Sequence, residues 1–102
     1  MTFTELHQRI FGGQRGGSTM AIVHYLLDRY DAGDTQVSKE QVAADTGIHK
    51  NNVNTIAVAL KEQGIIEAFS YANNEVFEIQ AGRGFRAFYE LTPAVLALYR
   101  RS

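Results

Sequence analysis

The sequence predicts an α+β domain that is mainly α-helical, and three observations support this. Between residues 18 and 62, apolar side chains recur at helical spacings of three and four, in segments that end at glycine. Beyond Gly64 the pattern changes from helix to strand, and residues 85–91 alternate with a period of two, which is typical of β-strands. The chain has 102 residues, of which 45% are hydrophobic and 21% charged, so it suits one domain with one core.

The first 17 residues are expected to form a short helical arm and a glycine-rich linker, separate from a main domain of residues 18–102. Thr2 occupies an N-cap position, and Glu5 three residues later completes a capping box. Gly12 and Gly13 then end this helix. The stretch GGQRGG matches neither of the common glycine-rich phosphate-binding spacings, so a linker is favoured over a phosphate-cradling nest.

Three further helices are expected in the first two thirds of the chain. Each starts after a residue that caps helices or after a tight turn, and each ends where the apolar periodicity stops. They cover about residues 19–30 after the cap Ser18, the segment between the cap Ser38 and Gly47, and His49–Glu62 before Gly64. A very short strand is expected at residues 36–37.

The last third of the chain predicts an antiparallel hairpin or a three-stranded sheet, followed by one helix. The expected strands are residues 65–71, 76–80 and 85–91, with tight turns at Asn73–Asn74 and at residues 81–84. Thr92 is an expected N-cap, and Pro93 suits the first position of a last helix that extends to about Arg101.

The strongest local pattern is QVAADTGIHKNNVNTIAVAL, from Gln41 to Leu60. It combines a small residue where two helices approach, a glycine that permits a left-handed turn, and apolar anchors in the turn and the second helix. This pattern resembles the helix-turn-helix of bacterial transcription regulators, and SKEQVAADTGIHKNNVNTIAVALKEQGII looks like its winged version. Five positions carry the residue types usual in that motif: Ala43, Gly47, Ile48, Val53 and Ile56.

The resemblance extends over residues 37–92 and implies a winged helix-turn-helix with extra N- and C-terminal helices that binds double-stranded DNA. Its second helix would enter the major groove, where asparagine pairs with adenine and lysine reaches guanine or phosphate. The alternative is plain solvation, since asparagine also favours caps and turns. The polar residues at the start of this helix are His49, Lys50, Asn51, Asn52, Asn54 and Thr55.

Three arginines outside that helix are further candidates for DNA contact. Arg83 lies between two glycines at the expected tip of the wing, where it would meet phosphate or a minor groove. An ordinary hairpin loop explains the same residues equally well. Arg86 is expected to support the contact of Arg83, and Arg15 in the glycine stretch resembles a groove-seeking arm.

These features predict a sequence-specific transcriptional regulator, more specifically a repressor, because a chain this short leaves no room for a separate effector domain. A plasmid or phage protein for replication or partition is an alternative within DNA binding. A winged-helix protein-interaction module is an alternative of another class. The acidic middle of the chain favours this module somewhat, because residues 18–81 contain nine acidic and four basic side chains.

The sequence contains no enzyme signature, and no cofactor or metal is expected. His24 and Asp28 are one helical turn apart, but a pair without further ligands is more often a surface contact. A core of this size has limited room for the apolar residues of both terminal helices, so we expect a homodimer through these helices and a near-palindromic operator. The alternative is that both helices cover the core of a single chain. The absence of cysteine, of a signal peptide and of a long apolar run predicts a cytoplasmic protein that does not enter a membrane.

Overall fold

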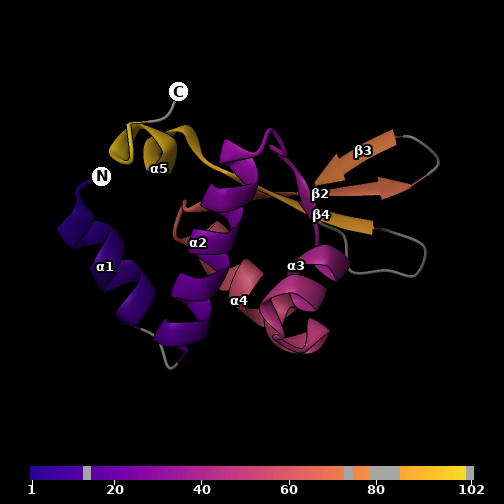
Figure 1. Cartoon of the computed structure of the whole chain (residues 1–102), viewed down its shortest axis with the longest axis horizontal. Helices are drawn as coiled ribbons and strands as arrows, with labels where there is room; N and C mark the ends of the chain where they lie inside the picture. Colours follow the sequence, from indigo (N-terminus) through magenta and orange to yellow (C-terminus); the bar gives the residue numbers. More distant parts are fainter. Residues whose placement is uncertain (13–14, 73–74, 79–85, 101–102) are drawn as a thin grey trace.

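The computed structural model describes residues 1–12, 15–72, 75–78 and 86–100, and it confirms an α+β fold that is mainly helical (Figure 1). Helices α1 to α4 come first along the chain, most of the sheet follows them, and α5 comes last. The elements are α1 (Phe3–Phe11), α2 (Gly16–Asp31), β1 (Val37–Ser38), α3 (Lys39–Thr46), α4 (Lys50–Glu62), β2 (Ile66–Ala72), β3 (Glu75–Glu78), β4 (Arg86–Leu91) and α5 (Pro93–Leu98).

Short-range hydrogen bonds set several helix boundaries where the sequence predicts them. The Thr2 hydroxyl accepts a hydrogen bond from the Glu5 amide at 3.1 Å, which confirms the cap of α1. The Ser38 hydroxyl accepts from the Gln41 amide at the same distance and caps α3. Gly64, with φ 74°, follows α4 in the left-handed conformation that glycine adopts without steric cost.

Two predicted boundaries are wrong. Helix α2 begins at Gly16, and its N-cap is Arg15 rather than Ser18. The chain is already helical before Ser18, and the Thr19 hydroxyl donates to the Arg15 carbonyl at 2.7 Å. Helix α5 ends at Leu98 rather than Arg101, because Tyr99 leaves helical geometry and Arg100 has a φ of 60°.

The four strands form one antiparallel sheet in the order β1-β4-β2-β3. The two-residue β1 pairs with β4 at the edge of the sheet, one position later than the strand predicted at residues 36–37. On the face turned toward the helices, Ile66 lies opposite Leu91 and Ala68 lies opposite Tyr89. The predicted turns at residues 73–74 and 81–84 lie outside the described residues.

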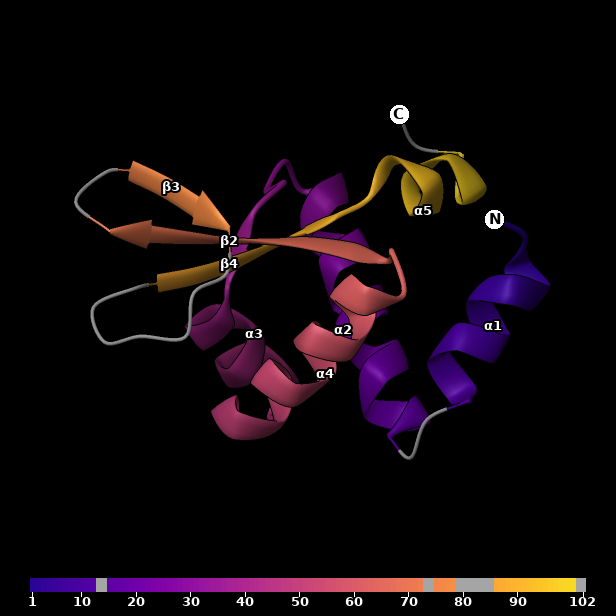
Figure 2. The same cartoon turned by 180° about the vertical axis from the view of Figure 1, so that it is seen from behind.

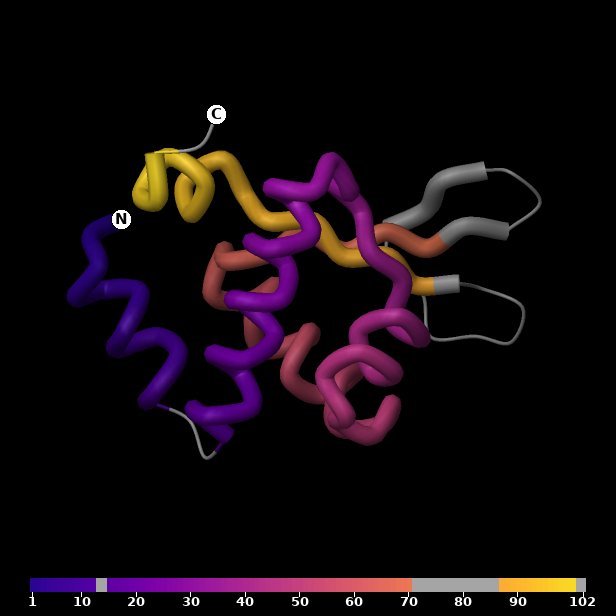
Figure 3. Tube along the Cα trace, in the orientation of Figure 1, coloured from indigo at the N-terminus to yellow at the C-terminus, as the bar shows by residue number. Residues whose placement is uncertain are grey.

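The core lies between this face of the sheet and the helices, and both terminal helices contribute to it (Figure 3). Leu6 and Ile10 of α1 are each 2% exposed and belong to the same cluster as the buried residues of α2 and α4. Phe3 packs edge-on against Tyr99, just after α5, with ring centroids 5.3 Å apart. The first helix is therefore packed against the rest of the fold.

Tyr89 is a buried phenol in the middle of β4, and we expect its hydroxyl to make the protein sensitive to alkaline pH. Its oxygen has no hydrogen-bond partner among the described residues. Burial raises the pKa of Tyr89 to about 12 from 10.0, and the negative charge of Glu40 adds to this shift. The unfolded chain thus ionises first as pH rises above 10, so the stability that this group contributes is lost between pH 10 and 12.

The variant Tyr89→Phe separates this effect from the titration of other groups. At pH 7 its melting temperature should equal or exceed that of the wild type, because the hydroxyl has no hydrogen bond to lose within the described part of the chain. Between pH 10 and 12 its melting temperature should fall less steeply than that of the wild type. A loss of more than about 1 kcal/mol at pH 7 would show that the hydroxyl has a partner in solution.

Candidate nucleic-acid interface

A three-residue turn joins α3 to α4 and determines how α4 projects from the molecule. Gly47 has a φ of 75°, and its amide donates to the Ala43 carbonyl at 3.0 Å. The Thr46 hydroxyl donates to the Val42 carbonyl at 2.6 Å and accepts from the Ile48 amide at 3.3 Å. These hydrogen bonds give partners to two carbonyl groups at the end of α3, and the next helix begins after three further residues.

Helix α4 buries one face and exposes the other. It runs from beside α3 to the point where β2 begins (Figure 2). Spacings of three and four place Val53, Ile56, Ala57 and Leu60 in the core, where each is at most 3% exposed. All six polar residues predicted to contact DNA at the start of this helix are exposed: His49, Lys50, Asn51, Asn52, Asn54 and Thr55.

His49 is the N-cap of α4, so it has a structural role as well as an exposed position. Its Nδ1 accepts a hydrogen bond from the Asn51 amide at 3.2 Å. The remaining amides of the first turn carry the partial positive charge of a helix N-terminus, which favours a nearby anion. Lys50 adds a full positive charge at the same end, and residues 49–61 contain no acidic side chain.

The structure separates the asparagines of α4 into two faces. Asn51 and Asn54 are three residues apart and lie on the outer face. Asn52 lies on the side of α4 that faces the start of α2, where its Oδ1 accepts a hydrogen bond from Arg15 Nη1 at 2.6 Å. Arg15, predicted as a mobile arm, is thus attached to α4 by a contact between residues 37 positions apart.

Val58 is a residue of the outer face that our sequence interpretation missed. It lies four positions after Asn54, one turn further along α4, and is 41% exposed. An apolar side chain in this position is complementary to the methyl group of thymine. A helical wheel of residues 49–62 places Val58 opposite the buried stripe, so the signal was present in the sequence.

A hydrogen bond between α2 and α3 holds α3 in place beside α2. The Tyr25 hydroxyl donates to the Asp45 carboxylate at 2.5 Å. Partial burial raises the pKa of Tyr25, and the hydrogen bond and negative charge of Asp45 raise it further. Asp45 is the one acidic residue in the last turn of α3, and this hydrogen bond gives its carboxylate a partner.

The two arginines predicted to lie in a wing are placed only in part. Arg83 lies outside the described residues, and Arg86 begins β4 opposite Tyr71 of β2. That end of the sheet extends beyond α3, on the side of the molecule away from α1 and α5 (Figure 2). The start of β4 therefore lies away from the terminal helices.

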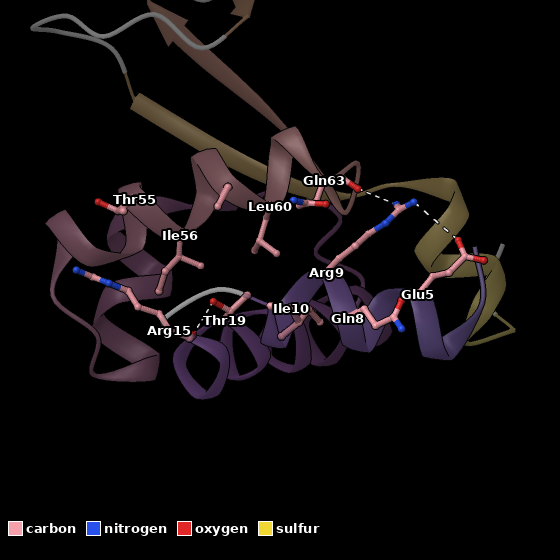
Figure 4. Close-up of a pocket in the computed structure, with 12 residues that line it drawn as sticks. Glu5, Gln8, Arg9, Ile10, Arg15, Thr19, Thr55, Ile56, Leu60 and Gln63 are labelled. Atoms are coloured by element: carbon pink, nitrogen blue, oxygen red, sulfur yellow. Dashed lines mark hydrogen bonds and ion pairs between the residues drawn. The ribbon is translucent and has the colours of Figure 1, made fainter.

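A cleft of about 730 Å³ separates α1 and the start of α2 from the side of α4 that carries Thr55, Ile56 and Leu60 (Figure 4). Arg15 lies at one end of it and Arg9 at the other, with apolar side chains of α1 and α4 between them. Arg9 Nη1 donates to the Gln63 carbonyl at 2.9 Å, and Arg9 Nη2 lies 3.8 Å from Glu5 Oε2.

The described residues contain no group of three or more histidine, cysteine, aspartate or glutamate side chains placed to hold a metal ion. His24 and Asp28, the pair considered from the sequence, are both exposed on α2. None of the helices in the described part of the chain has the length and apolarity that a membrane span requires.

Comparisons of this chain with protein-family models, with curated proteins and with solved structures found no match.

Proposed function

We propose that this chain is a winged helix-turn-helix protein that binds double-stranded DNA and regulates transcription. The observation that carries the proposal is the placement of α4. A glycine turn follows α3, the apolar stripe of α4 is buried, and its polar first two turns are exposed. A helix presented in this way, with short polar side chains near its N-terminus, fits the major groove. The sheet beyond α3 is the wing of this proposal.

Each exposed side chain of α4 has a chemical role in this proposal. The amides of Asn51 and Asn54 have the donor and acceptor pair that recognises adenine, and Lys50 reaches guanine or phosphate. Arg15, bonded to Asn52, contacts phosphate beside the groove. Wing residues Arg83 and Arg86 are assigned to phosphate or to the minor groove.

The overall charge of −1 does not oppose this role, because what matters is the charge of the docking face. The start of α4 has Lys50, the adjacent Arg15 and the positive end of the helix dipole. Asp45, the nearest acidic residue before the turn, accepts the hydrogen bond of Tyr25. With few phosphate contacts, affinity should fall with salt on a shallow slope, and base contacts should contribute much of the selectivity.

We propose that the protein acts as a homodimer through its terminal helices and represses transcription in the cytoplasm. Phe3 and Phe11 of α1 remain 56% and 46% exposed after the core has formed, which leaves apolar surface for a second copy. Repression requires only that the bound dimer occupies a promoter. Two copies of α4 about 34 Å apart would read half-sites one turn of DNA apart.

Selection of duplexes from a random-sequence library by the purified protein tests this function. We expect enrichment of a near-palindromic sequence with half-site centres about 10 base pairs apart. Fluorescence anisotropy on the selected duplex should give an affinity that decreases as salt rises. A protein that is folded but binds no duplex even at low salt would refute DNA binding and favour the protein-interaction module.

A further inference from the structure

The cleft between α1 and α4 has the composition of a small-molecule site. Its volume of about 730 Å³ lies within the range of ligand pockets, which combine apolar walls with a few polar groups. The apolar side chains between its two ends are Ile10 of α1 and Ile56, Ala59 and Leu60 of α4. Thr19 and Thr55 add hydroxyl groups at the end where Arg15 lies (Figure 4).

The two arginines of the cleft differ in how their charge is compensated. Arg9 is near Glu5 and donates to the Gln63 carbonyl, so its position is set by the protein itself. Arg15 has no ion pair with any acidic side chain among the described residues, and its partner there is the neutral amide of Asn52. The N-terminus of α2, which lacks a side-chain cap, adds positive potential at this end. An anionic group of a ligand would therefore compensate the positive charge of Arg15.

We propose that this cleft binds a small organic acid with an apolar body, and that the bound acid weakens the binding of DNA by α4. The carboxylate pairs with Arg15, and the apolar body lies against Ile56 and Ala59. This effector role rests on the function proposed above, whereas the ligand site itself does not.

Coupling between the two sites follows from residues that they share. Arg15 donates to Asn52, which follows Asn51 in the sequence and lies on the neighbouring side of α4. A carboxylate that pairs with Arg15 competes for this hydrogen bond and neutralises a charge beside the proposed phosphate path. Thr55 belongs both to the exposed start of α4 and to the cleft wall. Because binding free energies are linked, DNA should weaken the binding of the acid by the same factor.

The test uses 2-naphthoate as the probe and 2-naphthamide, its neutral analogue, as the control ligand. Amide chemical shifts measured by NMR on the free protein should change most at Thr19, Thr55 and Ala59 when 2-naphthoate is added. Arg15→Gln should weaken 2-naphthoate about tenfold and remove its advantage over 2-naphthamide. Lys61→Gln, which removes the same charge from α4 outside the cleft, should leave this affinity unchanged.

Anisotropy with the selected duplex then measures the coupling. Saturating 2-naphthoate should raise the duplex Kd by at least about fivefold, and 2-naphthamide should leave it unchanged. An absence of shifts at the cleft, or equal binding to wild type and Arg15→Gln, overturns the site. Cleft binding in a protein that binds no duplex supports the site and refutes the proposed function. An unchanged duplex Kd under saturating 2-naphthoate overturns the coupling.

Discussion

Lys50→Ala and Asn54→Ala, each introduced alone, should weaken binding of the selected duplex by about tenfold or more and leave the melting temperature unchanged. Both side chains are exposed on the first two turns of α4, so neither supports the core. A bidentate contact between an amide and adenine, or between lysine and guanine, is worth about 1–3 kcal/mol. Anisotropy titrations measure the affinity, and thermal denaturation measures the stability of each variant.

The two substitutions should change duplex binding in different ways, so comparing them tells more than the loss of affinity alone. If Lys50 contacts phosphate, its removal weakens all duplexes about equally and lowers the dependence of affinity on salt. Removal of Asn54 should instead relax the preference for one base pair in each half-site. Lys61→Ala is the matched control, because it removes an equal charge from the last turn of the same helix. Wild-type affinity in both Lys50→Ala and Asn54→Ala would exclude the start of α4 as the DNA surface.

Leu6→Ala should lower the free energy of unfolding by about 2–4 kcal/mol, which is a large fraction of the stability of a domain this size. Leu6 is 2% exposed and belongs to the core cluster that α2, α4 and the sheet share. Truncation removes its buried apolar surface and leaves a cavity at the contact between α1 and the rest of the fold. Denaturation in urea, followed by circular dichroism, measures the change.

Gln8→Ala is the control for this experiment, since Gln8 is an exposed residue of the same helix. Its stability should stay within about 0.5 kcal/mol of the wild type. The two variants together decide whether residues 1–17 fold as a separate arm or as part of one cooperative unit. A change below about 0.5 kcal/mol in Leu6→Ala would support the separate arm that the glycine-rich stretch suggested.

Features that depend on nearest neighbours along the chain were predictable from the sequence. The caps at Thr2 and Ser38 are hydrogen bonds across three residues, and the stop at Gly47 is a backbone conformation of a single residue. The buried stripe of α4 follows from 3.6 residues per turn. The change to strands after Gly64 follows from a period of two. Such preferences depend on a few neighbouring residues, so they can be predicted from a short segment of the sequence.

The sequence by itself therefore determined where most helices and strands lie and which face of α4 is apolar. Only the tertiary structure decided that α1 packs its Leu6 and Ile10 into the common core, and that Arg15 reaches Asn52. It also decided that α2 starts before Ser18 and that a cleft separates α1 from α4. The core packing of α1, the Arg15–Asn52 contact and the cleft depend on segments far apart in the chain, and their geometry is set by how whole elements pack, which the residue pattern of a single segment does not show. The start of α2 instead involves a local hydrogen bond from Thr19 to Arg15.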